Sequence, residues 1–132
     1  FNGQYIYVIA DLANVKNTLE PQTITHYEIK FKDRINEYDK LISGLKNTAI
    51  WGAGAKGSTF LNLLDKECKK VKCVVDINPK KQHQFIGGTG HFIIKPEALA
   101  EQMIENIIVM NSNYIDEIKK TIEPRHINLV TL

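Results

Sequence analysis

The chain has 132 residues, two cysteines and a formal net charge of +2, which suits one compact domain that needs neither disulfides nor a metal to fold. Its 17 basic and 15 acidic residues are interspersed, so the sequence gives no argument for binding nucleic acid or an anionic membrane surface. No apolar run approaches the roughly 20 residues of a membrane span and no signal peptide is present, so we expect a cytoplasmic protein.

The first part of the chain, residues 1–25, is predicted to be a strand followed by a connection. Residues 4–10 are rich in aromatic and β-branched side chains, which favours a strand. Residues 11–25 are polar and show no sustained period. Because the chain begins at Phe1 without a methionine, we expect a fragment of a longer protein, in which residues 1–25 follow a preceding domain.

A long helix is predicted next. Apolar residues from Tyr27 to Leu45 recur at steps of three and four, which places them on one helical face. Thr25 suits the N-cap position, and Glu28 completes a capping box. We expect this helix to end near Leu45 or Lys46.

The centre of the sequence is an apolar run that meets a glycine-rich turn and then a helical segment. Gly52, Gly54 and Gly57 fit the G-x-G-x-x-G spacing. In that pattern the first glycine permits a sharp turn, the second lets the backbone approach a phosphate, and the third packs the helix against the strand. The helix is predicted over residues 58–70, with Leu63 facing inward and Asp65 facing outward.

Strands and helices then alternate to the end of the chain. The sequence predicts a strand over 71–76, a short strand over 92–94, a helix from Pro96 that carries Met103, a strand over 106–110, a helix over 114–122 and a strand over 127–132. This alternation indicates a parallel sheet covered on both faces. The predicted fold class is α/β: a Rossmann-like, doubly wound parallel sheet of order 3-2-1-4-5 over residues 26–132, with an N-terminal strand and long helix added.

The glycine turn and a later acid carry the predicted chemistry. The turn would present backbone N–H groups and the positive end of a helix to an anion, and Lys56 would add a charge. The alternative is that the glycines only permit close packing of helix and strand. Asp76 follows Gly52 at roughly the 20-residue offset at which an acid meets a ribose hydroxyl, or it caps a turn with Asn78.

Other polar residues are expected at the same edge of the sheet. Lys80, Lys81 and Gln82 follow the turn after the second strand and either contact phosphate or form a solvated charged run. Asn113 follows the strand next to the glycine loop, where such sheets bind ligands, but it also suits a helix N-cap.

The sequence shows no catalytic or metal-binding constellation. The four histidines lie far apart and none has the spacing of a metal ligand pair. No serine or cysteine lies in a nucleophile elbow, and Cys68 and Cys73 are expected to be reduced thiols in or near the core. We therefore predict a recognition domain with no catalytic residue and no metal.

Four sequence blocks together resemble the C-terminal domain of S-adenosylmethionine-dependent sugar C-methyltransferases. The segment 52–59 is similar to G-A-x-A-K-G-N-T, and 74–82 is similar to V-V-D-x-N-P-x-K-Q, continued by Gly88-Thr89. The segment 112–118 resembles W-N-x-x-D-E-I, and 2–8 resembles the end of the preceding methyltransferase domain. The sequence departs from the family at Ser112 (usually Trp), Ile77 (often Arg), Gly87 (Pro) and the additional Gly90.

The resemblance implies a domain that binds a nucleotide-linked sugar and is not catalytic alone. It implies no cofactor in this fragment, S-adenosylmethionine in the parent protein, and as partners the nucleotide-sugar and the preceding methyltransferase domain of the same chain, with no nucleic acid and no membrane. The residues implied in ligand contact are Gly52, Gly54, Lys56, Gly57, Asp76, Lys81, Gln82, Thr89 and Asn113.

Two other functions stay open from the sequence. The three glycines and Asp76 also satisfy the fingerprint of an NAD(P)-binding domain of an oxidoreductase or redox sensor. A third possibility is a scaffold or dimerisation domain that binds no ligand.

Overall fold

The computed structural model describes residues 31–123 and 125–132, together with residues 9, 11 and 13. Residues 31–132 form one compact unit, which is described here by itself. The strand predicted over 4–10, apart from residue 9, and the capping box of Thr25 and Glu28 lie outside the described residues. The elements of the compact unit are α1 (Phe31–Gly44), β1 (Thr48–Trp51), α2 (Ala55–Leu64), β2 (Val71–Val75), β3 (Ile93–Ile94), the 3₁₀ helix η2 (Pro96–Ala100), β4 (Asn106–Val109), the 3₁₀ turn η3 (Ser112–Tyr114), α3 (Ile115–Ile122) and β5 (Asn128–Thr131).

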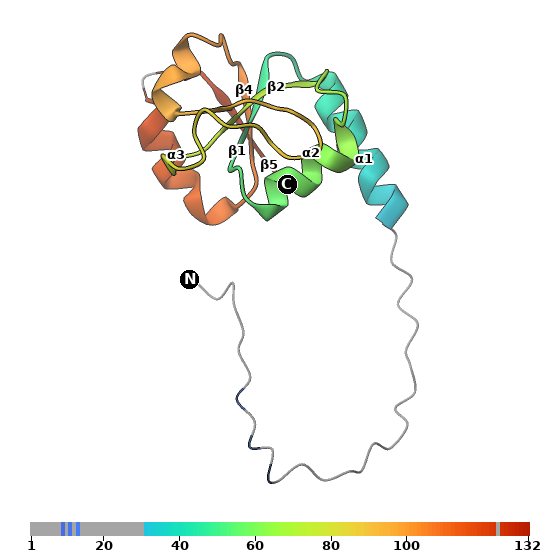
Figure 1. The fold of residues 1–132 in the computed structure, drawn as a ribbon. Helices are drawn as coiled ribbons and strands as arrows, with labels where there is room; N and C mark the ends of the chain where they lie inside the picture. Colours follow the sequence, from blue (N-terminus) through green and yellow to red (C-terminus); the bar gives the residue numbers. More distant parts are fainter. Residues whose placement is uncertain (1–8, 10, 12, 14–30, 124) are drawn as a thin grey trace. The chain divides into compact units, whose positions relative to one another are not determined.

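The five strands form one parallel sheet in the order β3-β2-β1-β4-β5 (Figure 1), so the predicted fold class is confirmed. Strand β1 lies at the centre and pairs with β2 on one side and β4 on the other. The chain therefore reverses its direction of winding at β1. The glycine turn that follows β1 stands at this switch point.

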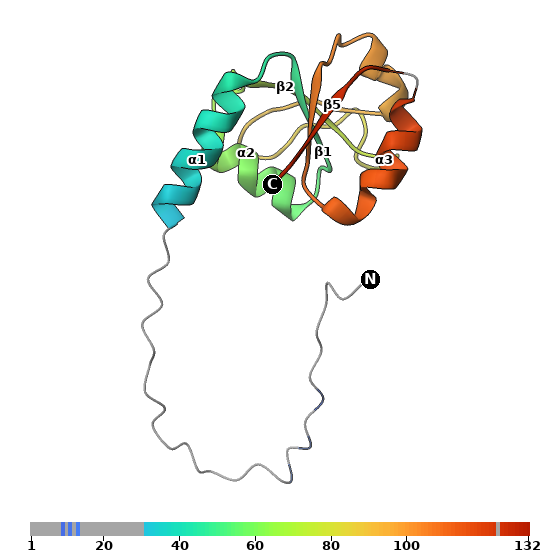
Figure 2. The ribbon, with the colours of Figure 1, turned by 180° about the vertical axis from the view of Figure 1, so that it is seen from behind.

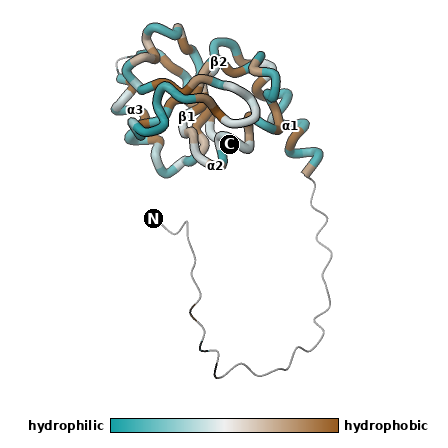
Figure 3. The backbone as a smooth tube through the Cα atoms, in the orientation of Figure 1, coloured by the Kyte–Doolittle hydropathy of each residue, from teal (hydrophilic) through white to brown (hydrophobic). Residues whose placement is uncertain are grey.

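Helices cover both faces of the sheet. Helices α1 and α2 lie on one face and α3 with η2 on the other (Figure 2). Side chains alternate between the two faces along each strand, so Ile50 packs with α1 and α2 whereas Ala49 packs with α3. All four residues of β1 are buried, and the strands at the centre of the unit are its most hydrophobic segments (Figure 3). The core thus has two layers with β1 between them.

Helix α2 is shorter than predicted and begins earlier. It spans Ala55–Leu64 instead of 58–70 because Asp65 leaves the helical conformation and its carboxylate binds the amides that follow. Asp65 is only 4% exposed, so its predicted outward orientation is wrong. Leu63 is 49% exposed, so its predicted inward orientation is also wrong.

The helix predicted from Pro96 is a short 3₁₀ helix that ends at Ala100. Met103, expected on its buried face, is 74% exposed and has a positive φ of 49°. The chain must turn here to enter β4, because the amides of Glu105 and Asn106 both bond to the carbonyl of Asn47 beside β1. These two bonds hold residues 105 and 106 beside β1, so the chain turns at Met103 instead of continuing a helix.

The two cysteines occupy different environments. Cys73 lies in β2, where burial raises the pKa of its thiol to about 11 despite the opposing effect of Lys72. Cys68 is exposed in the turn after α2, so its predicted place in or near the core is wrong. Partial desolvation of its sulfur, and secondly the nearby Asp65 carboxylate, raise the pKa of the Cys68 thiol. Both cysteines are free thiols, and neither is activated as a nucleophile.

Asp65 and His91 form a buried polar pair at the C-terminal end of α2. His91 Nε2 lies 3.0 Å from Asp65 Oδ2, and His91 Nδ1 lies 2.8 Å from Thr89 Oγ1. The Asp65 carboxylate also accepts the amides of Lys69, Lys70 and Val71. Burial opposes its ionisation, but these amides and His91 outweigh burial and hold the pKa of Asp65 below its ordinary value.

We predict that Asp65→Asn lowers the free energy of unfolding by about 3 kcal/mol at pH 7, because an amide donor would then face several buried donors. Since the pKa of Asp65 is lowered in the folded protein, its stabilisation is complete above the unfolded-state pKa and is lost as the pH falls below about 4. Urea denaturation followed by circular dichroism at pH 7 and pH 3.5 measures both effects.

The control is Glu67→Gln, which makes the same chemical change on a side chain that is 74% exposed two residues away. This variant should change the urea midpoint of unfolding little, because exposed ion pairs contribute little to the free energy of unfolding. Equal midpoints for the two variants at pH 7 would contradict the role given to Asp65.

Candidate functional site

The glycine turn joins β1 to α2 at the carboxyl edge of the sheet. Gly52 has a φ of +113°, a conformation that favours glycine, and its amide bonds to the carbonyl of Val75 at 2.7 Å. A β-carbon on Gly57 would stand 2.1 Å from the Gly52 carbonyl oxygen. The first and third glycines of the motif are therefore required by the turn and by the close packing of helix on strand, as predicted.

Gly54 has a different environment. It is the N-cap of α2, and a β-carbon added to it would meet no atom of the described residues within 4 Å. Among those residues no side chain caps the helix at this end, and the first amides of an α-helix have no carbonyl partner within the helix. The space in front of Gly54 is thus open, and uncapped amides with the positive end of the helix dipole face it.

Lys56 lies in the first turn of α2 and is exposed. Among the described residues it forms no ion pair with an acidic side chain. Together with the helix dipole, its ammonium makes this end of α2 electropositive. An anion is the kind of ligand that such an arrangement attracts.

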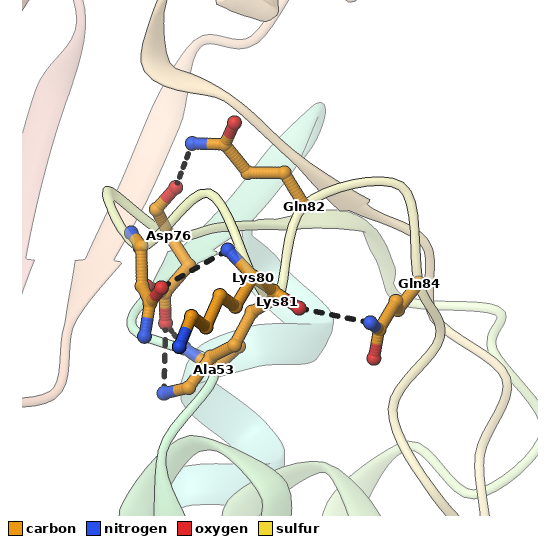
Figure 4. Close-up of polar contacts among 7 residues, drawn as sticks. Ala53, Asp76, Lys80, Lys81, Gln82 and Gln84 are labelled. Carbon is orange, nitrogen blue, oxygen red and sulfur yellow. Dashed lines mark hydrogen bonds and ion pairs between the residues drawn. The ribbon is translucent and has the colours of Figure 1, made fainter.

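Asp76, directly after β2, is tied to the glycine turn (Figure 4). Its Oδ2 accepts the amide of Ala53 at 2.8 Å and the Lys81 ammonium at 3.3 Å, and its Oδ1 accepts the amide of Asn78 at 2.9 Å. Asp76 is only 7% exposed. The carboxylate therefore shapes the glycine loop and also caps the turn with Asn78, the second role that the sequence left open.

The segment after Asp76 folds back over it. The side-chain amide of Gln82 donates to the main-chain carbonyl of Asp76 at 2.9 Å, beside the Lys81 ion pair (Figure 4). Lys80 is exposed and donates its own amide to Asn78 Oδ1. The structure thus brings together most of the predicted site, namely Gly52, Gly54, Lys56, Gly57, Asp76, Lys81 and Gln82.

Thr89 is not part of this group. Its hydroxyl bonds to His91, which contacts Asp65 at the C-terminal end of α2. The loop before Thr89 also contacts the second half of α2, where the Asn62 side chain donates to the Gly87 carbonyl at 3.0 Å. As a ligand contact it stays a prediction, but the structure places it near the amino end of β2, away from the glycine turn.

Asn113 lies after β4, next to β1, and thus at the correct edge of the sheet. Its predicted role as a helix N-cap is wrong: the cap of η3 is Asn111, whose side chain accepts the Asn113 amide at 3.1 Å. The residue at the N-cap of α3 is Tyr114, and Asn113 itself is exposed.

Two features of the site were missed by sequence reasoning. One is the bond from the Ala53 amide to Asp76, for which the only signal was the order of glycine turn and acid. The other is an apolar groove beside the first turn of α2, lined from α1 by Phe31, Ile35 and Tyr38. The period of α1 signalled an apolar face, but not that part of it stays uncovered.

The described residues contain no group of three or more His, Cys, Asp or Glu side chains that would hold a metal ion. Among their helices none is long and apolar enough to cross a membrane.

The sheet order and the glycine turn at its switch point define a Rossmann-like α/β domain. The family model described as the C-methyltransferase C-terminal domain matches residues 9–127. The chain therefore belongs to the C-methyltransferase C-terminal domain family. Curated proteins gave no significant match.

Solved structures of the Rex-family repressor RSP resemble the chain. The repressor structure shares 18% sequence identity over 76% of this chain and 60% of that chain, with a TM-score of 0.49. The complex of RSP with β-NAD⁺ and operator DNA shares 20% sequence identity, over 76% of this chain and 58% of that chain, with a TM-score of 0.49. The complex with β-NADH shares 18% sequence identity, over 76% of this chain and 61% of that chain, also with a TM-score of 0.49. The chain thus spans about three fifths of those repressor chains, and similarity this low says nothing about its ligand.

We predict that Gly57→Ala lowers the free energy of unfolding by about 3 kcal/mol, because the new methyl group would overlap the Gly52 carbonyl and force backbone apart. Gly54→Ala should cost less than about 1 kcal/mol, since φ is −91° and the β-carbon meets open space. Thermal and urea denaturation compare the two variants, which carry the same substitution three residues apart. Similar losses at both positions would contradict this assignment of the glycines.

Proposed function

We propose that this domain binds the nucleotide-linked sugar substrate of an S-adenosylmethionine-dependent C-methyltransferase. The observation that carries the proposal is the open space at Gly54, bordered by uncapped helix amides and by Lys56. A diphosphate would accept hydrogen bonds from those amides and be attracted by the helix dipole and the ammonium. Membership of the C-methyltransferase C-terminal domain family supports this ligand class.

The charges at the site favour a phosphate over the methyl donor. S-adenosylmethionine carries a sulfonium, an ammonium and a single carboxylate, so the positive end of α2 and Lys56 would attract it less strongly than a diphosphate. In this proposal the cofactor is therefore bound by a preceding methyltransferase domain of the parent protein.

In this proposal the domain contributes binding and not chemistry. It holds the nucleotide at the carboxyl edge of the sheet and presents the sugar carbon to the methyl donor bound by the preceding domain. Fixing the two reactants relative to each other lowers the entropic part of the barrier to methyl transfer. No residue of this domain is assigned a proton transfer.

We predict that the domain binds dTDP- or UDP-sugars in isothermal titration calorimetry and that Gly54→Val weakens binding at least about 10-fold. We expect the valine side chain to fill the space in front of the helix amides and to leave the fold intact, because its β-carbon would meet no atom of the described residues within 4 Å. At 100 times its dissociation constant, a bound ligand should stabilise the wild-type domain by about 2.7 kcal/mol.

The matched control is Gly87→Val, where a β-carbon also meets open space but in the loop near Thr89. It should bind like the wild type. An absence of heat with every nucleotide-sugar at millimolar concentration would refute the proposal. Enhanced NADH fluorescence on mixing would then favour an oxidoreductase or redox sensor, and an unchanged melting temperature with all nucleotides a scaffold.

A further inference from the structure

A groove of about 500 Å³ lies between α1 and α2 and reaches the ends of β4 and β5. Its lining is mainly apolar and aromatic, and the last described residue, Leu132, lies beside α2 at its border (Figures 1 and 2). Three of the lining side chains are about half exposed, namely Phe31 at 55%, Leu63 at 49% and Leu132 at 43%. Such exposed apolar surface in a concave site is typical of ligand-binding and interaction sites.

The groove is continuous with the first turn of α2. Ala55 and Lys56, whose amides belong to the uncapped end of the helix, are also among the residues that line it. Lys56 therefore borders the proposed diphosphate position and the groove together. If the phosphates of a nucleotide were bound at the N-terminal end of α2, its nucleoside could therefore extend into this groove.

The opposite side of the glycine loop is filled. In dinucleotide-binding domains the acid after the second strand receives the ribose. Here that acid, Asp76, accepts the amides of Ala53 and Asn78 and the ammonium of Lys81, which uses three of its roughly four lone-pair positions. A nucleoside placed there would have to displace Lys81 and would compete with the bond that shapes the loop.

The groove has the chemistry of a nucleobase site. Of its aromatic rings, Phe31 is half exposed and Tyr38 is partly exposed, whereas Phe60 is buried behind Tyr38 at 6.1 Å. The guanidinium of Arg34 lies 5.9 Å from the Tyr38 ring centroid and 3.5 Å from the exposed Glu37 carboxylate. Aromatic faces stack with any base, and guanidinium N–H groups donate to the carbonyl oxygens and ring nitrogens on base edges. The groove thus offers an apolar, aromatic wall with donors at its rim, next to a cradle for phosphate.

We propose that the α1–α2 groove holds the nucleobase of the nucleotide-sugar, on the opposite side of the glycine loop from Asp76. This inference rests on the proposed function, because it requires a nucleoside diphosphate at the end of α2. It assigns recognition of the base to α1, and it leaves the contacts of Asp76 with the loop intact when ligand binds.

The experiment compares dTDP, which has a base, with inorganic pyrophosphate, which has none. Thr59 is exposed and lines the groove, so Thr59→Trp should fill it without adding charge. We expect this variant to bind dTDP at least about 10-fold more weakly than the wild type in calorimetry and to bind pyrophosphate equally well. Asn36→Trp, exposed on α1 but not in the groove, is the matched control and should bind both like the wild type.

A second measurement guards against a misfolded variant. In ¹H–¹⁵N spectra of the wild-type chain, dTDP should shift the amide signals of Arg34, Ile35 and Tyr38, and pyrophosphate should not. Phe31→Ala, which removes one half-exposed ring, should weaken dTDP binding about 3-fold while circular dichroism stays unchanged.

The outcomes separate the two proposals. If wild type, Thr59→Trp and Phe31→Ala bind dTDP equally and the α1 signals do not move, the base lies elsewhere and the inference fails, although the proposed function stands. A groove that receives the preceding methyltransferase domain would give this result. If the wild type binds pyrophosphate but neither dTDP nor UDP, or binds none of them, the proposed function fails together with the inference.

Discussion

The site depends on the close approach of helix α2 to the end of strand β1. The Gly52 carbonyl oxygen occupies the place where a β-carbon on residue 57 would stand, so the helix can begin here only because that residue has no side chain. The bond from the Ala53 amide to Asp76 adds a second tie, from β2. These two constraints set the direction of the first amides of α2 and the position of Lys56, which together make this edge of the sheet electropositive.

The other end of α2 is fixed by different chemistry. Gly90 has a φ of +78°, and its amide donates to the Ile86 carbonyl at 2.9 Å. This turn brings His91 back to Asp65 in the core, where the two side chains lie 3.0 Å apart. The C-terminal end of α2 is therefore held by a buried polar pair, whereas its N-terminal end is set by the glycine turn.

The strand order could be predicted because apolar, β-branched runs alternate with helical segments, and parallel crossovers leave few arrangements. The C-terminal end of α2 could not be predicted, because it depends on hydrogen bonds of the Asp65 carboxylate. These bonds come from amides that follow in the chain and from His91, which lies 26 residues later. Most of the predicted site residues lie close together because they follow adjacent strands. Thr89 was included only from the resemblance of motifs, and its bond to His91 places it near the opposite end of α2.

The two sides of the glycine loop leave different room for a ligand. On one side, Asp76 is engaged by the loop and covered by Lys81 and Gln82, so a ligand that needed this carboxylate would weaken the tie that shapes its own phosphate cradle. On the other side, the α1–α2 groove is open and shares Lys56 with the cradle. Under the proposed placement, the glycine motif supplies affinity for phosphate in any ligand, whereas selectivity among ligands depends on α1. Because α1 lies outside the motif, its side chains can vary and change the ligand without cost to the fold of the turn.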